Sequence, residues 1–128
     1  MEDIIQFDIS KPLFEQVAQS LRISIAKAEL KAGYKLPTLH ELAQHYEVSQ
    51  AVVAHALKVL EQEALIVSDK FQDYYVTLAL PRIELLKSKL VEQYARDFVF
   101  YAQKYGLSLN EAQSILSREW DEMHELNT

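Results

Sequence analysis

Apolar residues recur at helical spacing through the first quarter of the chain. Over residues 12–29 they step by three or four positions, which predicts a helix with one apolar stripe. The stripe consists of Phe14, Val17, Leu21, Ile25 and Ala28. Ser10 is the expected N-cap residue, because its hydroxyl can accept a hydrogen bond from the first turn. A turn is expected near Gly33.

Two further helices are predicted next, each opened by a hydroxyl residue. Thr38 and Glu41 have the spacing of a capping box, in which each side chain accepts a hydrogen bond from the other's backbone N–H. Ser49 is expected to cap a third helix that ends near Glu63. The predicted buried positions of this third helix are Val53, Ala56, Leu57, Leu60 and Ala64.

The pattern then changes from helical spacing to alternation. Residues 65–67 and 74–77 are β-branched and aromatic, which predicts two short strands joined by a hairpin tip at residues 68–73. Three helices followed by a hairpin is the order of a winged helix-turn-helix. Two more helices are predicted, over 82–105 and after Ser108. The predicted fold is therefore mostly α, with a small β-hairpin wing and a two-helix C-terminal segment.

Composition removes several classes of protein. The chain has no cysteine, which excludes a disulfide framework, a thiolate zinc site and a cysteine nucleophile. Its two glycines exclude a Gly-rich phosphate loop.

No apolar run approaches the roughly 18 residues that span a bilayer, and the N-terminus has no signal-peptide pattern. We therefore expect a soluble cytoplasmic protein with no membrane association. No carboxylate pair, nucleophile or metal-ligand set has a recognisable spacing, so we expect no catalytic residue, metal or cofactor, and no enzyme.

Several short motifs in residues 12–77 occur in the order of a known family. They are Pro12-Leu13-Phe14-Glu15-Gln16-Val17, Glu29-Leu30-Lys31-Ala32-Gly33, Lys35-Leu36-Pro37-Thr38, Glu41-Leu42-Ala43 and Leu60-Glu61-Gln62-Glu63-Ala64-Leu65-Ile66. This segment resembles the N-terminal winged helix-turn-helix of the GntR family of bacterial transcription regulators. The resemblance implies a DNA-binding domain at residues 1–78.

The remaining segment, residues 79–128, is short for that family. It resembles the small YtrA-type subfamily, in which two C-terminal helices serve dimerisation. The resemblance implies a homodimer that reads a two-fold symmetric, double-stranded DNA operator. An aromatic row at helical spacing is interpreted as the packing seam of that dimer, with a ligand pocket as the alternative. The expected dimer interface consists of Leu86, Leu90, Tyr94, Phe98, Tyr101, Leu116 and Trp120.

The DNA-contacting positions depart from the family pattern. His40 stands where the family has an arginine, His55 where it has a cation, and both wing glycines are absent. Residues 1–78 carry 7 basic and 11 acidic side chains, a net of −4 within a total of −6. We therefore expect weaker contact that favours A·T pairs, supported by Lys11, Arg22 and Lys35 among others. The expected DNA-binding residues are Thr38, His40, Ser49, Gln50, Ala51, Val52, His55, Lys58, Lys70 and Gln72.

Three functions remain open. The first is a dimeric DNA-binding regulator, most simply a repressor that blocks promoter access. The second is a degenerate family member that binds protein instead of DNA, which the acidic balance favours. The third is a sensor whose small-molecule effector is unknown. If His40 and His55 face phosphate, protonation should strengthen DNA binding as pH falls. Phe71 at the wing tip either folds back on the domain or contacts a partner.

Overall fold

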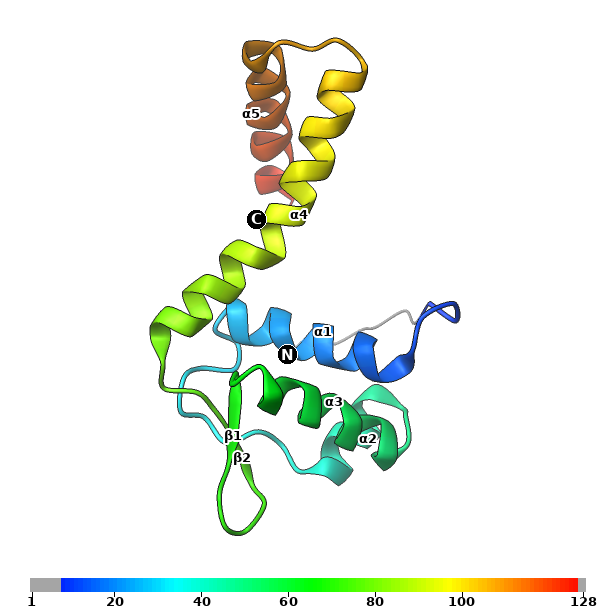
Figure 1. Ribbon diagram of the computed structural model, residues 1–128, viewed down its shortest axis with the longest axis vertical. Coiled ribbons are helices and arrows are strands. Elements are labelled where there is room, and N and C mark those ends of the chain that lie inside the picture. The colour runs from blue at the N-terminus through cyan, green and yellow to red at the C-terminus, as the bar shows by residue number, and fades with distance from the viewer. Residues whose placement is uncertain (1–7, 127–128) are drawn as a thin grey trace. The chain divides into compact units, whose positions relative to one another are not determined.

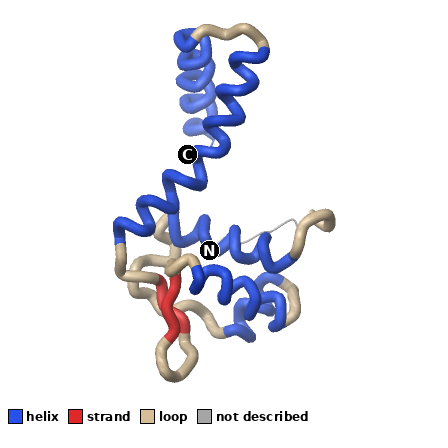
Figure 2. Tube along the Cα trace, viewed as in Figure 1, coloured by secondary structure: helices blue, strands red, loops and turns tan. Residues whose placement is uncertain are grey.

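The computed structural model describes residues 8–126 as five helices and one two-stranded hairpin (Figures 1 and 2). This confirms the predicted fold class. Residues 1–7, where no signal-peptide pattern was expected, and residues 127–128 lie outside the described range. The elements are α1 (Leu13–Ala26), α2 (Leu39–Tyr46), α3 (Gln50–Gln62), β1 (Ile66–Ser68), β2 (Tyr74–Val76), α4 (Leu80–Lys104) and α5 (Leu109–Leu126).

The chain divides into two compact units, residues 1–87 and 88–128. The boundary between these two units lies inside α4. The first two turns of α4 go with the N-terminal unit because Ile83 is buried in its core and Leu86 packs against that core. Each unit is therefore described separately.

The core of the N-terminal unit lies where α1, α2, α3 and the hairpin converge. The apolar stripes predicted for α1 and α3 supply most of it, and Leu21, Val53 and Leu60 are fully buried. Tyr46 of α2 adds a polar contact inside the core, since its hydroxyl lies 3.1 Å from the Ser20 hydroxyl. Burial of this cluster is the main favourable term that holds the unit together.

The starts of α2 and α3 agree with the predictions. The Thr38 hydroxyl accepts from the Glu41 backbone N–H at 3.1 Å, and the Glu41 carboxylate accepts from the Thr38 N–H at 2.9 Å, which completes the capping box. The Ser49 hydroxyl accepts from the Val52 N–H at 3.2 Å. The turn between α2 and α3 thus runs from Glu47, the C-cap residue of α2, to the Ser49 cap.

The prediction for both ends of α1 was wrong. Pro12 occupies the N-cap position, and the Ser10 hydroxyl instead donates to the Asp8 carboxylate at 2.6 Å. The helix ends at Ala26, and Ala28 is exposed in the left-handed region with φ of 62°. Its N–H donates to the Ile25 carbonyl at 3.1 Å, as in a Schellman motif. Glycine is the usual residue at such a position, so its absence concealed the end of the helix.

The hairpin is antiparallel, with Ile66 paired to Val76 and Ser68 to Tyr74. The segment before α2 also pairs with β2, through a bridge between Lys35 and Tyr75. Gly33 makes this approach possible. Its φ is 82°, and a Cβ there would lie 2.9 Å from the Leu78 side chain. The wing is thus attached to the unit along its full length up to the tip.

The C-terminal unit contains the rest of α4 and all of α5, which run antiparallel (Figure 1). Gly106 ends α4 with φ of 77°, as predicted. Ser108 and Glu111 form the predicted capping box of α5, with hydrogen bonds of 2.9 and 3.2 Å. Ala102 and Ala112 are buried in this unit. Small residues at the contact allow two helices to pack closely.

Candidate nucleic-acid interface

One face of α3 is turned fully outward from the N-terminal unit. The side chains of Ala51, Ala54, His55 and Lys58 are exposed, whereas Val53 on the opposite face is buried. Gln50 is also exposed, and Val52 is half-buried. A helix that presents small and polar side chains along one open face has the shape and chemistry to enter the major groove of DNA.

His40 and Gln50 meet at the adjoining starts of α2 and α3. The Gln50 side-chain nitrogen lies 3.2 Å from the His40 Nδ1 atom, and both residues are exposed. With a neutral His40, the Gln50 amide donates to this ring nitrogen. Its second N–H and its oxygen then remain for a base edge, and adenine matches this pair because its N7 accepts and its N6 amino group donates. His40 is therefore placed to orient Gln50.

The predicted hydroxyl residues already serve the local structure. The Thr38 and Ser49 oxygens both accept cap hydrogen bonds. The Thr38 backbone N–H, and secondarily the Thr38 side chain, hold the pKa of Glu41 below its usual value. The N-terminus of α2 is therefore partly satisfied by Glu41, and those groups are not open to a phosphate.

His55 does not project freely from α3. Its ring stacks on Phe14 of α1, with the ring centroids 3.6 Å apart and the planes 12° from parallel. Phe14 is half-buried, so the stack holds His55 against α1. The sequence placed Phe14 in the core stripe and gave no sign of this contact, because the two residues lie on different helices.

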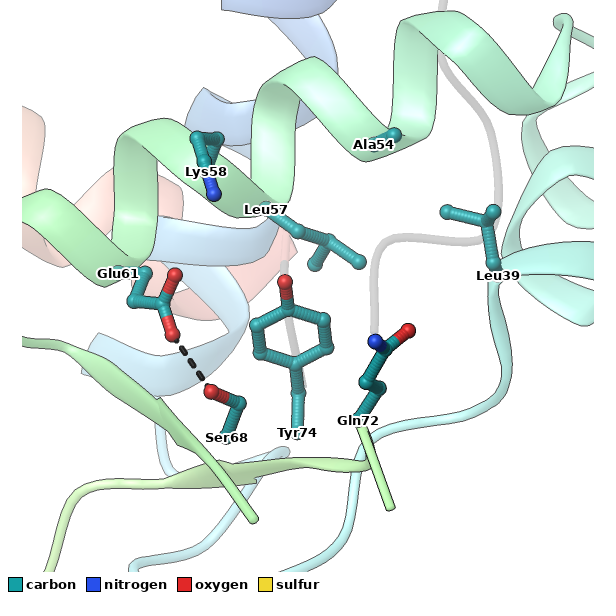
Figure 3. Close-up of a pocket in the computed structure, with 8 residues that line it drawn as sticks. All are labelled: Leu39, Ala54, Leu57, Lys58, Glu61, Ser68, Gln72 and Tyr74. Atoms are coloured by element: carbon teal, nitrogen blue, oxygen red, sulfur yellow. Dashed lines mark hydrogen bonds between the residues drawn. The ribbon is translucent and has the colours of Figure 1, made fainter. Parts of the chain in front are cut away.

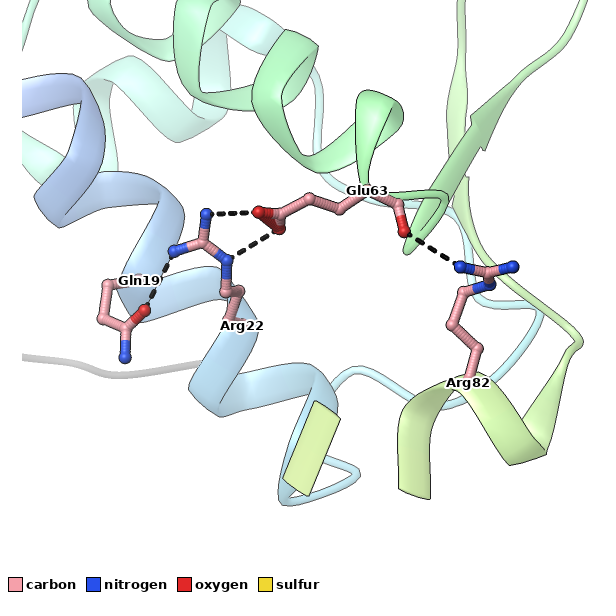
Figure 4. A network of polar contacts seen from close by, with 4 residues as sticks. All are labelled: Gln19, Arg22, Glu63 and Arg82. Atoms are coloured by element: carbon pink, nitrogen blue, oxygen red, sulfur yellow. Dashed lines mark hydrogen bonds and ion pairs between the residues drawn. The ribbon is translucent and has the colours of Figure 1, made fainter. Parts of the chain in front are cut away.

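Arg22 is not available as a cation for DNA. Its guanidinium forms two hydrogen bonds of 2.8 Å with the Glu63 carboxylate, and a third of 2.9 Å with Gln19 (Figure 4). The Glu63 backbone carbonyl also accepts from Arg82 at 3.4 Å. This network joins α1 and the start of α4 to the C-cap of α3. The charge of Arg22 is matched by Glu63, which argues against the expected support of DNA contact by Arg22.

The other cations of the N-terminal unit differ in their surroundings. The Lys35 ammonium lies 3.5 Å from the Asp73 carboxylate. The Lys70 ammonium lies 5.1 Å from the centroid of the Phe71 ring. Lys58 is exposed on α3, and among residues 8–126 no salt bridge to it is found. Lys58 and Lys70 therefore keep their charge for an external anion.

The wing tip retains an ordered turn without glycine. The Asp69 carboxylate accepts from the backbone N–H groups of Phe71 and Asp73, at 2.9 and 3.0 Å. Gln72 takes the left-handed conformation, with φ of 64°. Desolvation raises the pKa of Asp69, but those two N–H groups, the Tyr75 hydroxyl and the charge of Lys35 together outweigh it and lower the pKa. Asp69 is therefore the residue that holds the turn, which an aspartate at the start of a hairpin loop can indicate.

A groove of about 440 Å³ separates α3 from the wing (Figure 3). Lys58 and Glu61 line its α3 side, while Ser68, Gln72 and Tyr74 line its wing side. The Ser68 hydroxyl donates to Glu61 at 2.8 Å. Burial, and then the charge of Glu61, raise the pKa of the Tyr74 hydroxyl. Of these residues the sequence singled out Lys58 and Gln72 as DNA contacts, but not Glu61, Ser68 or Tyr74.

The residues expected at a dimer interface are distributed over both units. Leu86 packs against the core of the N-terminal unit. In the C-terminal unit Leu90 and Phe98 are half-buried, whereas the others are exposed. Exposed members are Tyr94, Tyr101, Leu116 and Trp120.

Two general features limit the chemistry of the described residues. Across residues 8–126, no three His, Asp or Glu side chains lie close enough together to hold a metal ion. Nor does any helix in that range combine the length and the apolar character needed to cross a membrane.

Comparison with known proteins identifies the family. Residues 13–75 match the gntR family of bacterial regulatory proteins. A GntR family transcriptional regulator from Listeria monocytogenes is 27% identical with a TM-score of 0.82, and the match covers 88% of this chain and 98% of that one. YtrA from Sulfolobus acidocaldarius, a GntR-family transcription factor, is 31% identical with a TM-score of 0.53, covering 79% and 98% of the two chains.

A curated relative adds a repressor to these matches. The HTH-type transcriptional repressor YtrA of Bacillus subtilis (strain 168) is 33% identical over 91 residues, which span 70% of this chain and 65% of that protein. The resemblance drawn from the motifs in residues 12–77 is thereby confirmed. This chain belongs to the GntR family of bacterial regulatory proteins, whose members are transcription regulators and not enzymes.

Proposed function

We propose that this protein is a DNA-binding transcription regulator that acts as a homodimeric repressor on a two-fold symmetric operator. The outward face of α3 is the observation that carries the proposal. It is exposed along its length, bears Lys58, and begins beside the His40–Gln50 pair. A polar face that the fold leaves uncovered needs a polar partner, and the major groove accepts a helix of this width.

Dimerisation is supported by apolar side chains that the C-terminal unit leaves uncovered. On α5, Leu109, Leu116, Trp120 and Met123 recur at steps of 7, 4 and 3, so they share one side of the helix. All four are more than half exposed, with Trp120 at 77%. An unpaired apolar stripe of this kind marks a protein-binding surface. A second copy of the chain satisfies it and also pairs two α3 helices for a symmetric site.

A protein-binding role without DNA is the second candidate function. The observation in its favour is the neutralisation of cations near the outward face, where Arg22 is paired with Glu63 and Lys35 lies close to Asp73. Non-specific DNA affinity comes mostly from Lys and Arg contacts with phosphate. Loss of those phosphate contacts would lower the affinity of this protein for any DNA duplex, which favours a protein partner. It would not affect the contacts that Gln50 can make with a base.

The test is a substitution that repels DNA without disturbing the fold. Ala51→Glu adds a negative charge to the exposed first turn of α3, where a carboxylate favours the helix dipole. Ser114→Glu, on an exposed position of α5, is the matched control. Binding to genomic DNA fragments should be abolished by the first change and kept by the second. If the unaltered protein binds no fragment even at low salt, the protein-binding role replaces this proposal.

A further inference from the structure

Phe71 at the wing tip is the exposed group that neither the core nor the α3 face explains. Its side chain is 73% exposed, so it does not fold back onto the unit. A single exposed apolar side chain on a surface needs no explanation. This one differs because it stands on a projecting turn whose backbone is held in one conformation.

Three hydrogen bonds hold the backbone of the turn that carries Phe71. The Phe71 N–H donates to Asp69 at 2.9 Å, the Asp73 N–H donates to the same carboxylate oxygen at 3.0 Å, and the Gln72 N–H donates to the Asp69 carbonyl at 3.0 Å. An aromatic side chain on a fixed backbone loses little conformational entropy when it is inserted into a partner. The wing tip is therefore preorganised for insertion.

The cation beside the ring gives the tip one contact for a polyanionic partner. The Lys70 ammonium stands 5.1 Å from the Phe71 ring centroid, so the two side chains approach a partner together. The acidic neighbours are engaged within the wing. Asp69 is bound to backbone N–H groups, and Asp73 lies 3.5 Å from Lys35. The groups that the tip offers to a polyanion are thus one cation and one aromatic ring.

The position of the tip beside α3 indicates where on DNA it would act, and this step rests on the proposed function. The loop between β1 and β2 projects beyond α3 on the side away from α1 (Figure 1). With α3 in a major groove, an element beside it crosses one sugar–phosphate strand and reaches the neighbouring minor groove. Apolar side chains that enter a minor groove separate stacked base pairs and bend the duplex.

We propose that Phe71 inserts between base pairs in the minor groove beside each half-site and bends the operator, while Lys70 contacts the adjacent phosphate. Bending favours flexible pyrimidine–purine steps, so the operator carries such a step where the wing tip lands. The inference assigns Phe71 a role in DNA deformation, distinct from the base reading assigned to Gln50.

The experiment measures bending and affinity on one operator fragment, selected with the wild-type protein. Fluorescence energy transfer between dyes at the two DNA ends reports how far the duplex is bent. The fluorescence of a 2-aminopurine base placed at the predicted step reports whether the base pairs there are unstacked. Phe71→Ala should abolish both signals and weaken binding by about tenfold, while Phe71→Leu, a smaller wedge, should retain most of the bend. Tyr34→Ala is the control, since it removes another exposed ring at the base of the hairpin.

Equal bending and affinity for wild type and Phe71→Ala would overturn the inference and assign Phe71 to a protein partner, while the proposed function would stand. A wild-type protein that binds the operator without bending it would also overturn the inference. Failure of the wild type to bind any DNA would refute the proposed function itself, and the inference with it.

Discussion

Lys58 and Arg22 form a matched pair of cations that tests how the interface is assigned. Lys58 is exposed on the outward face of α3, whereas the Arg22 side chain is 18% exposed and bound twice to Glu63 at 2.8 Å. Each phosphate that a cation neutralises contributes about −0.9 to the slope of log affinity against log salt. Lys58→Ala should therefore reduce the magnitude of that slope by about 0.9 for each copy of the chain, or about 1.8 for the proposed dimer.

The size of the effect makes it easily measured. For the two symmetric phosphate contacts of a dimer, the affinity changes by roughly 12-fold between about 50 and 200 mM salt, and Lys58→Ala should remove that share of the dependence. Arg22→Ala should leave the slope unchanged but lower the free energy of unfolding by about 1 kcal/mol, because Glu63 is 39% exposed and solvent screens the pair.

The assay is fluorescence anisotropy with one operator fragment at several salt concentrations, paired with urea unfolding of each variant. Equal slopes for wild type and Lys58→Ala would show that the outward face of α3 does not meet phosphate. A reduced slope for Arg22→Ala would show that the Arg22–Glu63 pair opens when DNA binds, and would refute the assignment of Arg22 to structure alone.

Four further predictions concern single residues. Ala28→Gly should raise the free energy of unfolding, measured by urea titration, by about 0.5–1 kcal/mol, because glycine adopts the left-handed conformation at φ of 62° without strain. The control is Ala54→Gly in the exposed part of α3, which should lower the free energy of unfolding by about 1 kcal/mol. Leu60→Ala should cost about 2–5 kcal/mol by calorimetry, since the side chain is 0% exposed, and a much smaller loss would show that α3 packs differently. Because the folded-state pKa of Asp69 is lowered, its carboxylate should hold the wing above its unfolded-state pKa and release it as pH falls through the folded value. The protection factors of the Phe71 and Asp73 amides, which are corrected for the intrinsic pH dependence of hydrogen exchange, should therefore fall in acid. Asp69→Asn, which keeps an acceptor oxygen, should remove that dependence. His40→Ala removes the ring nitrogen that contacts the Gln50 amide, so operator selection with this variant should give a different or relaxed base preference at the position read by Gln50, and an unchanged preference would show that His40 does not orient Gln50.

The features predicted correctly from the sequence are those set by neighbouring residues. The capping pairs at Thr38 and Ser108 each involve a partner three positions away, so their spacing alone located the helix starts. The end of α1 was missed because the left-handed position carries Ala28 instead of glycine.

Contacts between distant residues were not predictable in the same way. Arg22 and Glu63 are 41 positions apart, and nothing local distinguishes Arg22 from a cation free to bind DNA. The stack of His55 on Phe14 and the contact of His40 with Gln50 likewise depend on how the helices pack. The residue types in the sequence indicated what kind of molecule the protein binds. Only the fold determined which of these side chains face outward.

Footprinting the protein on its operator by hydroxyl-radical cleavage tests the central claim most directly, namely that paired copies place their α3 helices in successive turns of one duplex face. The account predicts two protected segments related by two-fold symmetry, with centres about 10 base pairs or a multiple of that apart. A single unsymmetrical protected segment, or uniform cleavage along every genomic fragment, would contradict it.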